Sequence, residues 1–245
     1  MKKHIYFIAV LTGIVLFFAS CHGKRLRGKG NKITSTRTVT AFTELDLSAD
    51  LKVNITVTPG AQPSLVLHGY ENILQHIKVD NEKNVLRIYS DLGDSWSFDS
   101  HAGTSADLIV PSLAALDLSG STDADIHGSV SGDKFAVEIS GSGKLVIDNL
   151  NVTEFTTGVS GAANITVNGG TVQKASYEVN GAGKIAAFPL QANEVTTSVS
   201  GAAKADVTAL KTLNVNISGA GKIKYKGHPV INKDISGAGT VRDVN

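Results

Sequence analysis

The segment SDLGDSWSFDSHAG, at positions 90–103, gathers aromatic and acidic side chains that could bind a ligand. Trp96 is the only tryptophan of the chain. An aromatic ring beside carboxylates can stack on a sugar ring, and carboxylates in a loop can help to hold Ca²⁺. The alternative, which we expect more often for such a segment, is a hydrophobic plug surrounded by solvated acids. The residues of this candidate ligand loop are Asp91, Asp94, Trp96, Phe98 and Asp99.

A second candidate for chemistry is the acid pair Asp123 and Asp125. Glycosidases use two carboxyl groups at a defined separation across the substrate. Here the two acids are neighbours on one face of a predicted strand, and no Arg or Lys partner is obvious. A polysaccharide-active enzyme is therefore an alternative function for this chain and not the preferred one.

Other catalytic patterns are missing from the sequence. The histidines are scattered without metal-ligand spacing, and there is no nucleophile elbow, phosphate loop or Cys–His pattern. Residues 38–245 hold 15 Lys/Arg and 22 Asp/Glu, a net charge of −7, which argues against general nucleic-acid binding. We therefore expect no catalytic residues, no metal, no cofactor and no nucleic-acid partner.

The element that positions these residues is a repeated six-residue phrase. Seven copies begin at Ser119, Ser140, Ser160, Asn180, Ser200, Ser218 and Ser236, in steps of 21, 20, 20, 20, 18 and 18 residues. The copies read SGSTDA, SGSGKL, SGAANI, NGAGKI, SGAAKA, SGAGKI and SGAGTV. A fixed period in this range is typical of a solenoid.

Each repeat is predicted to hold two strands that meet at the phrase. A large aliphatic residue precedes every copy, and apolar residues follow five and mostly seven positions after the lead, which is the period of a strand. The second residue is always glycine, as a tight corner at positive φ requires, and the lead Ser or Asn could hydrogen-bond to nearby backbone. The corner glycines are Gly120, Gly141, Gly161, Gly181, Gly201, Gly219 and Gly237. We predict an all-β fold, a single-stranded parallel β-helix of 18–21 residues per turn, right-handed, with an N-terminal β excursion.

Charged residues recur at two outward positions beside each corner, and ion pairs could form at Glu138/Lys144 and at Glu178/Lys184. These positions could bind a glycan or an anionic partner. The preferred interpretation is a solvated, charge-balanced face that keeps the solenoid soluble and blocks lateral strand association. The candidate charged strip consists of Glu138, Lys144, Glu178, Lys184, Lys204 and Lys222.

The N-terminus carries an export signal. Residues 1–20 combine a positive start with an apolar stretch, and small residues then precede Cys21, the only cysteine. This pattern is typical of a bacterial lipoprotein signal peptide, although Phe18 departs from the usual leucine; an ordinary signal peptide or a membrane anchor is the alternative. We expect Cys21 to be lipidated, residues 21–37 to be a basic flexible linker, and the outer membrane to be a partner through the lipid.

Residues 38–245 are predicted to form one β-helix domain. Ser48-Ala49 resembles a degenerate first corner, residues 59–106 are expected to be a β excursion that caps the solenoid, and residues 107–245 carry the repeats. The hairpin within the excursion is expected to turn over Asn81–Asn84.

The order of these motifs carries a family resemblance. An F-x-x-L-x-L start is followed by a V-x-I-x-V strand, then by GYENILQHIKV, VLRIYSD, LIVPSL and the SG-x-G phrases. Over residues 37–245 this order resembles the family of exported Bacteroidetes proteins described as putative auto-transporter adhesin, head GIN domain. The resemblance implies a β-helix-like fold and an envelope location, and it brings no established catalytic residues.

The expected function is that of a non-enzymatic, lipid-anchored envelope protein, an adhesin or scaffold that presents a rigid solenoid to a glycan or an envelope protein. A periplasmic partner module in envelope signalling is a further alternative. No acidic cluster follows Cys21, and surface-exported lipoproteins of this bacterial group often carry one. The periplasmic face of the outer membrane is therefore slightly favoured over the cell surface.

Overall fold

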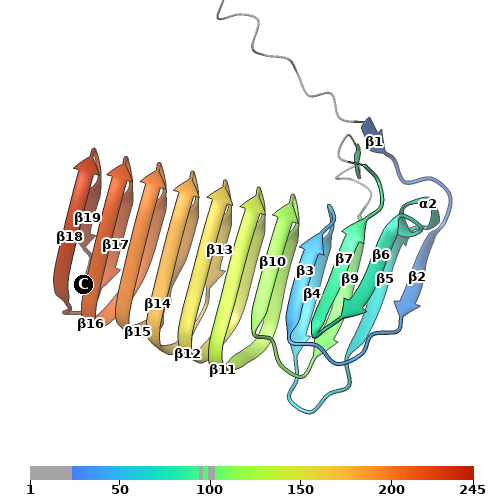
Figure 1. The fold of residues 1–245 in the computed structure, drawn as a ribbon, viewed down its shortest axis with the longest axis horizontal. Coiled ribbons are helices and arrows are strands. Elements are labelled where there is room, and N and C mark those ends of the chain that lie inside the picture. Colours follow the sequence, from blue (N-terminus) through green and yellow to red (C-terminus); the bar gives the residue numbers. More distant parts are fainter. Residues whose placement is uncertain (1–23, 94–95, 99–102) are drawn as a thin grey trace, which may run out of the picture.

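The structure, a computed structural model, describes residues 24–93, 96–98 and 103–245. The expected signal peptide, Cys21, Asp94 and Asp99 lie outside these residues. Almost all of the regular structure is β, and the strands stack into a solenoid whose axis is the long direction of the molecule (Figure 1). Within the described part of the chain, no helix is both long enough and apolar enough to cross a membrane.

The repeats form successive coils that pair in parallel, each one period from the next. Their strands are β10 (Ala115–Gly120), β11 (Asp123–Gly141), β12 (Lys144–Gly161), β13 (Asn164–Val167), β14 (Gly170–Gly181), β15 (Lys184–Gly201), β16 (Lys204–Gly219), β17 (Lys222–Lys226), β18 (Val230–Gly237) and β19 (Thr240–Asp243). The register places Val159 beside Val179, and Val179 beside Val199. The prediction of an all-β parallel solenoid is confirmed.

The aliphatic ladders fill the interior, because every second residue of each strand points inward. Near the middle of the repeats the filling is aromatic. The rings of Phe135 and Phe155 stack with centroids 6.0 Å apart, and Tyr177 meets Phe155 edge-on at 5.9 Å. Burial raises the pKa of Tyr177. Apolar burial at about 25 cal/mol per Å² is the main stabilising contribution to such a core.

The corners are held together by backbone groups. At five corners, from Gly120 to Gly201, the glycine carbonyl oxygen accepts a hydrogen bond from the next coil, as in Ala182 N–H to Gly161 O and Ala202 N–H to Gly181 O, both 2.9 Å. The expected bonds from the lead Ser or Asn to backbone are not found in the described residues; Asn180 instead donates to the Glu178 carboxylate. The lead position faces outward, since the aliphatic residue before it points into the core.

Glycine is required at these corners for two reasons. The backbone at Gly219 has φ of +128°, a conformation that residues with a Cβ rarely adopt. A Cβ at Gly219 would also lie 2.5 Å from the carbonyl oxygen of Gly201 in the preceding coil. Positive φ is found at all seven corner glycines.

The N-terminal part builds two further coils and a cap. Its elements are β1 (Lys24–Leu26), β2 (Lys32–Arg37), β3 (Glu44–Ser48), β4 (Lys52–Val57), β5 (Ser64–Tyr70), α2 (Glu71–Leu74), β6 (Ile77–Glu82), β7 (Val85–Ser90), β8 (Trp96–Phe98) and β9 (Ser105–Val110). Strand β3 lies between β7 and β10, and β4 lies between β9 and β11, all in parallel. The coil made of β3 and β4 is therefore inserted between the β7–β9 coil and the repeats.

The cap closes this end with antiparallel strands and the one-turn helix α2 (Figure 1). Strand β5 pairs with β9 and β2, β6 pairs with β7, and α2 buries Ile73 and Leu74. The β6–β7 turn is shorter than expected, with positive φ at Lys83 and Asn84 only. The expectation of a flexible linker over 21–37 is wrong for Lys32–Arg37, because the unpaired edge of β5 binds this segment as β2.

The C-terminal end is an open coil. Among the described residues, strands β18 and β19 have paired neighbours on one side only, β16 and β17. Lys233 follows Val215 in the ladder and Asp243 follows Tyr225, so charged residues occupy inward positions. Inward-pointing charges on an edge strand discourage further strand pairing, which accounts for the departure of Asp243 from the apolar pattern.

A test of the corner is the Gly219→Ala variant. Backbone strain alone should lower the free energy of unfolding by about 1–3 kcal/mol, and overlap with Gly201 O should add to this loss. Gly60→Ala is the matched control, because Gly60 has φ of +78° but open space around a Cβ. Urea unfolding of both variants measures the difference, and equal losses would refute the proposed corner overlap.

Candidate functional site

The candidate ligand loop is an expanded corner of the outermost coil. In the neighbouring coil β3 ends at Ser48 and β4 begins at Lys52, whereas β7 ends at Ser90 and β9 begins only at Ser105. The register pairs Ser48 with Tyr89 and Lys52 with Ser105. The segment between Ser90 and Ser105 therefore occupies the place of an SG-x-G corner, and we call it the expanded corner.

The two described aromatic residues of this segment have different environments. Strand β8 pairs in parallel with β1, and the Lys24 ammonium lies 5.3 Å from the centre of the Trp96 ring. Phe98 is 5% exposed and belongs to the core, as the plug interpretation predicts. Trp96 is 42% exposed, as a binding platform requires. Phe98 thus has the burial expected of the plug, and Trp96 has the exposure expected of a ligand platform.

Two cavities flank β8. The first, of about 440 Å³, is lined among others by Ser48, Asp50, Tyr89, Ser90, Trp96 and Ser119. The second, of about 390 Å³, is lined among others by Arg25, Asp50, Lys52, Phe98, Thr104 and Asp123. Asp50 and Phe98 border both cavities. Asp50 Oδ1 accepts a weak hydrogen bond from Ser121 N–H at 3.4 Å.

Sequence reasoning missed Asp50, Tyr89 and the surrounding serines because three distant segments supply them. The corner at 48–52 belongs to the inserted β3–β4 coil and stacks on the expanded corner. The corner at 119–123 stacks on the other side of that inserted coil. The available signal was the degenerate corner Ser48-Ala49, since a corner must lie next to other corners in a solenoid.

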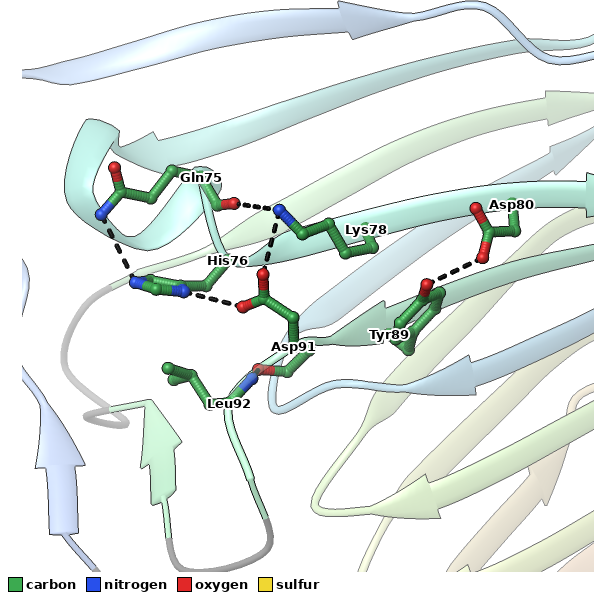
Figure 2. Close-up of polar contacts among 8 residues, drawn as sticks. Gln75, His76, Lys78, Asp80, Tyr89, Asp91 and Leu92 are labelled. Carbon is green, nitrogen blue, oxygen red and sulfur yellow. Dashed lines mark hydrogen bonds and ion pairs between the residues drawn. The ribbon is translucent and has the colours of Figure 1, made fainter.

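Asp91 holds the base of the expanded corner and lines neither cavity (Figure 2). Its carboxylate lies 3.0 Å from Lys78 Nζ and 2.7 Å from His76 Nδ1. Hydrogen bonds from Lys78 and then from His76 lower the pKa of Asp91. Its carboxylate is therefore already bound within the protein, which makes it a poor candidate for direct ligand contact.

Tyr89 lies beside this cluster and borders the Trp96 cavity. Its hydroxyl donates a hydrogen bond to Asp80 at 2.8 Å, and this bond raises the pKa of Tyr89 (Figure 2). The ring is thereby held in one orientation at the wall of the cavity.

The acid pair Asp123 and Asp125 is engaged in structural contacts. Asp123 Oδ1 accepts the backbone N–H of Lys144 at 2.9 Å, and Asp125 forms an ion pair with Lys52 at 2.9 Å. The expectation that the pair lacks a Lys partner is wrong. Lys52 reaches it because β4 lies beside β11, an adjacency that sequence spacing does not reveal.

The charged strip separates by sign. Ion pairs between Glu138 and Lys144 or between Glu178 and Lys184 are absent from the described residues, because each acid and lysine stand on opposite sides of a corner. Acids instead stack on acids: the register places Asp117 between Asp46 and Glu138. Burial first, and then the neighbouring carboxylates, raise the pKa of both Asp117 and Glu138.

In the described part of the chain, no group of three or more His, Cys, Asp or Glu side chains is arranged to hold a metal ion.

Glu138→Gln should raise the melting temperature at pH 7. The pKa of Glu138 is higher in the folded than in the unfolded protein, so ionisation of this carboxyl opposes folding. The free energy of unfolding therefore falls as the pH rises from the ordinary value of 4.5 through the raised pKa of the folded protein. The gain should disappear below the ordinary glutamate value of 4.5, where the carboxyl is protonated in both states. Thermal unfolding at several pH values checks this, with the exposed Glu82→Gln as control; a gain independent of pH would contradict it.

Comparison with solved structures shows the same fold in proteins of Bacteroides and Parabacteroides. A "putative adhesin" from Bacteroides fragilis is 23% identical, covers 89% of this chain and 100% of its own, and superposes with a TM-score of 0.81. A "putative adhesin" from Parabacteroides distasonis is 21% identical, covers 90% of this chain and 100% of its own, and superposes with a TM-score of 0.72. A "putative lipid binding protein" from Parabacteroides distasonis is 25% identical, covers 91% of this chain and 100% of its own, and superposes with a TM-score of 0.61. No curated protein matches the chain.

The family described as "Putative auto-transporter adhesin, head GIN domain" matches residues 41–229. This range spans the inserted coil, the excursion with the expanded corner, and the repeats as far as β17. The motif order, the solenoid and this match agree, and the chain belongs to that family.

Proposed function

We propose that this chain is a non-enzymatic cell-envelope protein that uses its rigid solenoid for adhesion and binds a glycan in the Trp96 cavity. The observation that carries the proposal is the exposed Trp96 ring at a cavity lined by serine hydroxyls and the Asp50 carboxylate. Family membership supports an adhesive role in the envelope.

The cavity has the chemistry that carbohydrate recognition requires. An exposed indole face packs against the C–H face of a sugar ring at little cost in conformational entropy. Hydroxyls of Ser48, Ser90 and Ser119 can donate to or accept from sugar hydroxyls, and Asp50 Oδ2 has no hydrogen bond to a described residue. An aromatic wall with a few polar groups is typical of small-molecule sites.

Polysaccharide hydrolysis is the second candidate function. The second cavity favours it, because Asp50 and Asp123 border that space together with Arg25 and Lys52. Against it, Asp123 Oδ1 is bound to backbone and Asp125 is paired with Lys52. A general acid or base must be able to exchange a proton with the substrate, so binding without turnover is the better interpretation.

Lipidation at Cys21 completes the proposal by fixing the protein to the outer membrane. Strands β1 and β2 follow this residue closely in sequence and lie at the capped end of the solenoid (Figure 1). The anchor would therefore attach near the end that bears the Trp96 cavity. An envelope protein is the alternative partner, and a periplasmic signalling module is the alternative role.

Trp96→Ala should weaken binding to a neutral glycan about tenfold, the loss expected when one aromatic stacking contact is removed. A glycan array with residues 21–245 first identifies the neutral probe, and calorimetric titration then compares the variants. Leu210→Ala is the control, because Leu210 is 45% exposed at a distant coil. Undiminished binding by Trp96→Ala would exclude the cavity, and turnover of a polysaccharide that is abolished by Asp123→Asn would overturn the non-enzymatic assignment.

Cys21→Ser should release the protein from the membrane fraction and abolish the incorporation of labelled palmitate. Protease shaving of intact cells should then place the domain: we expect protection, in keeping with the periplasmic face. Digestion in intact cells would place the domain on the cell surface, and an unchanged membrane fraction for Cys21→Ser would exclude the lipid anchor.

A further inference from the structure

The outward face of the strands that follow the corners carries a row of unneutralised cations in its C-terminal half. Two outward columns run along this face, at the fourth and sixth positions after the lead of each coil. Parallel pairing places Lys184, Lys204 and Lys222 side by side in the first column. It places Lys224 beside Arg242 in the second. We call these five residues the cationic strip.

The same two columns neutralise themselves in the N-terminal coils. Lys52 pairs with Asp125 at 2.9 Å, and Asp123 lies between Lys52 and Lys144 in the ladder. In the C-terminal coils the only acid within these two columns is Asp206, which lies beside Lys224 in the ladder. None of the five cations is in an ion pair with a described residue. A solvated, charge-balanced face therefore describes the first half of the columns and not the second.

Stacking of the strip has an electrostatic cost. Neighbouring strands lie about 4.8 Å apart, and like charges directly opposite each other destabilise a sheet. The acids that could neutralise the lysines, such as Glu178 and Asp234, stand across the corner on the other face. A bound polyanion would relieve this repulsion, and its charges would meet one cation at every coil.

The strip also has a shape and a chemistry that select among anions. The five cations line a groove of about 550 Å³ together with Asp206 and Thr240. A carboxylate and a hydroxyl among the cations favour a ligand that carries hydroxyl groups as well as negative charge. Phe188, against which Lys226 packs at 5.1 Å, follows Lys184 on the same outward face. Acidic polysaccharides combine these features, and an extended chain of sugars can follow the axis of the solenoid.

Two other anionic partners fit the strip less well. Membrane surfaces are bound by a basic face with apolar residues beside it, and the exposed large apolar residues of the described chain lie outside the strip. Nucleic acid would meet the net charge of −7 on residues 38–245, which opposes a long, densely charged polyanion.

We propose that the cationic strip is a second binding site, which takes a linear acidic polysaccharide lying along the solenoid axis and is distinct from the Trp96 cavity. The acid groups of the polymer pair with Lys184, Lys204, Lys222, Lys224 and Arg242, and Asp206 accepts hydrogen bonds from its hydroxyls. The site would strengthen attachment to an acidic matrix by engaging several weak contacts at once.

The test uses polygalacturonate and hyaluronate, which carry at most one charge per sugar, as acidic probes and neutral dextran as reference, in titrations with residues 21–245. The wild type should bind both acidic polymers and release them as salt is raised, because exposed ion pairs are screened. Lys204→Glu/Lys222→Glu should weaken this binding about tenfold or more. The milder Lys204→Gln/Lys222→Gln removes charge repulsion, so it should fold normally and bind with intermediate affinity.

The control is Lys134→Glu/Lys211→Glu, which changes the net charge equally at exposed lysines outside the strip. It should bind like the wild type. Equal weakening by the control, no preference for the acidic polymers over neutral dextran, or equal binding of duplex DNA or phosphatidylglycerol vesicles would each overturn the proposal. Trp96→Ala should leave acidic-polymer binding unchanged, which separates this site from the proposed glycan cavity.

Discussion

The structure depends on a backbone contact that recurs at the corners. The carbonyl oxygen of a corner glycine accepts an N–H from the next coil, and the glycine above lies so close that a Cβ would overlap this oxygen. The contact opposes a one-residue slip between coils, because such a slip would place a residue with a Cβ against the carbonyl and would turn the aliphatic ladder outward. The aliphatic ladders inside and the charged columns outside both follow from that single register.

Because the register is strict, equivalent outward residues of successive coils stack in columns. This stacking limits which positions can carry charges of the same sign. Because Asp117 lies between Asp46 and Glu138, the acids repel one another, and the raised pKa of Glu138 reflects first its burial and then this repulsion. Opposite charges within a column or between adjacent columns remove the penalty, as Lys52 and Asp125 do. Lys204 and Lys222 form no ion pair with a described residue. Their positive charges are therefore free to act on the anionic ligand that we propose.

The repeats could be predicted from the sequence because contacts in a solenoid join residues one period apart. The aliphatic ladders, the corners and even the degenerate corner at Ser48-Ala49 follow from that period. The insertion of the β3–β4 coil between β7–β9 and β10 could not, since it depends on pairing between segments without a common motif. This one unpredictable step explains two shortcomings: the missed Lys52–Asp125 pair and the missed wall of the Trp96 cavity.

The close glycine contact between stacked corners holds in the middle of the solenoid but not at its N-terminal end. The two regions therefore have different surface shapes. A Cβ at Gly120 would meet only Asp50 Oδ1, at 3.6 Å, so the tight corner contact begins one coil later, at Gly141. The outermost corner therefore had room to lengthen into a segment that brings together Trp96, Asp50 and several hydroxyls. Such a compact site suits a few sugar units. The columns repeat at about 4.8 Å for as long as the register holds, and a surface of that kind suits an extended polymer. One backbone constraint thus yields the two surface geometries on which our proposals rest, a compact cavity where the constraint ends and linear columns where it persists.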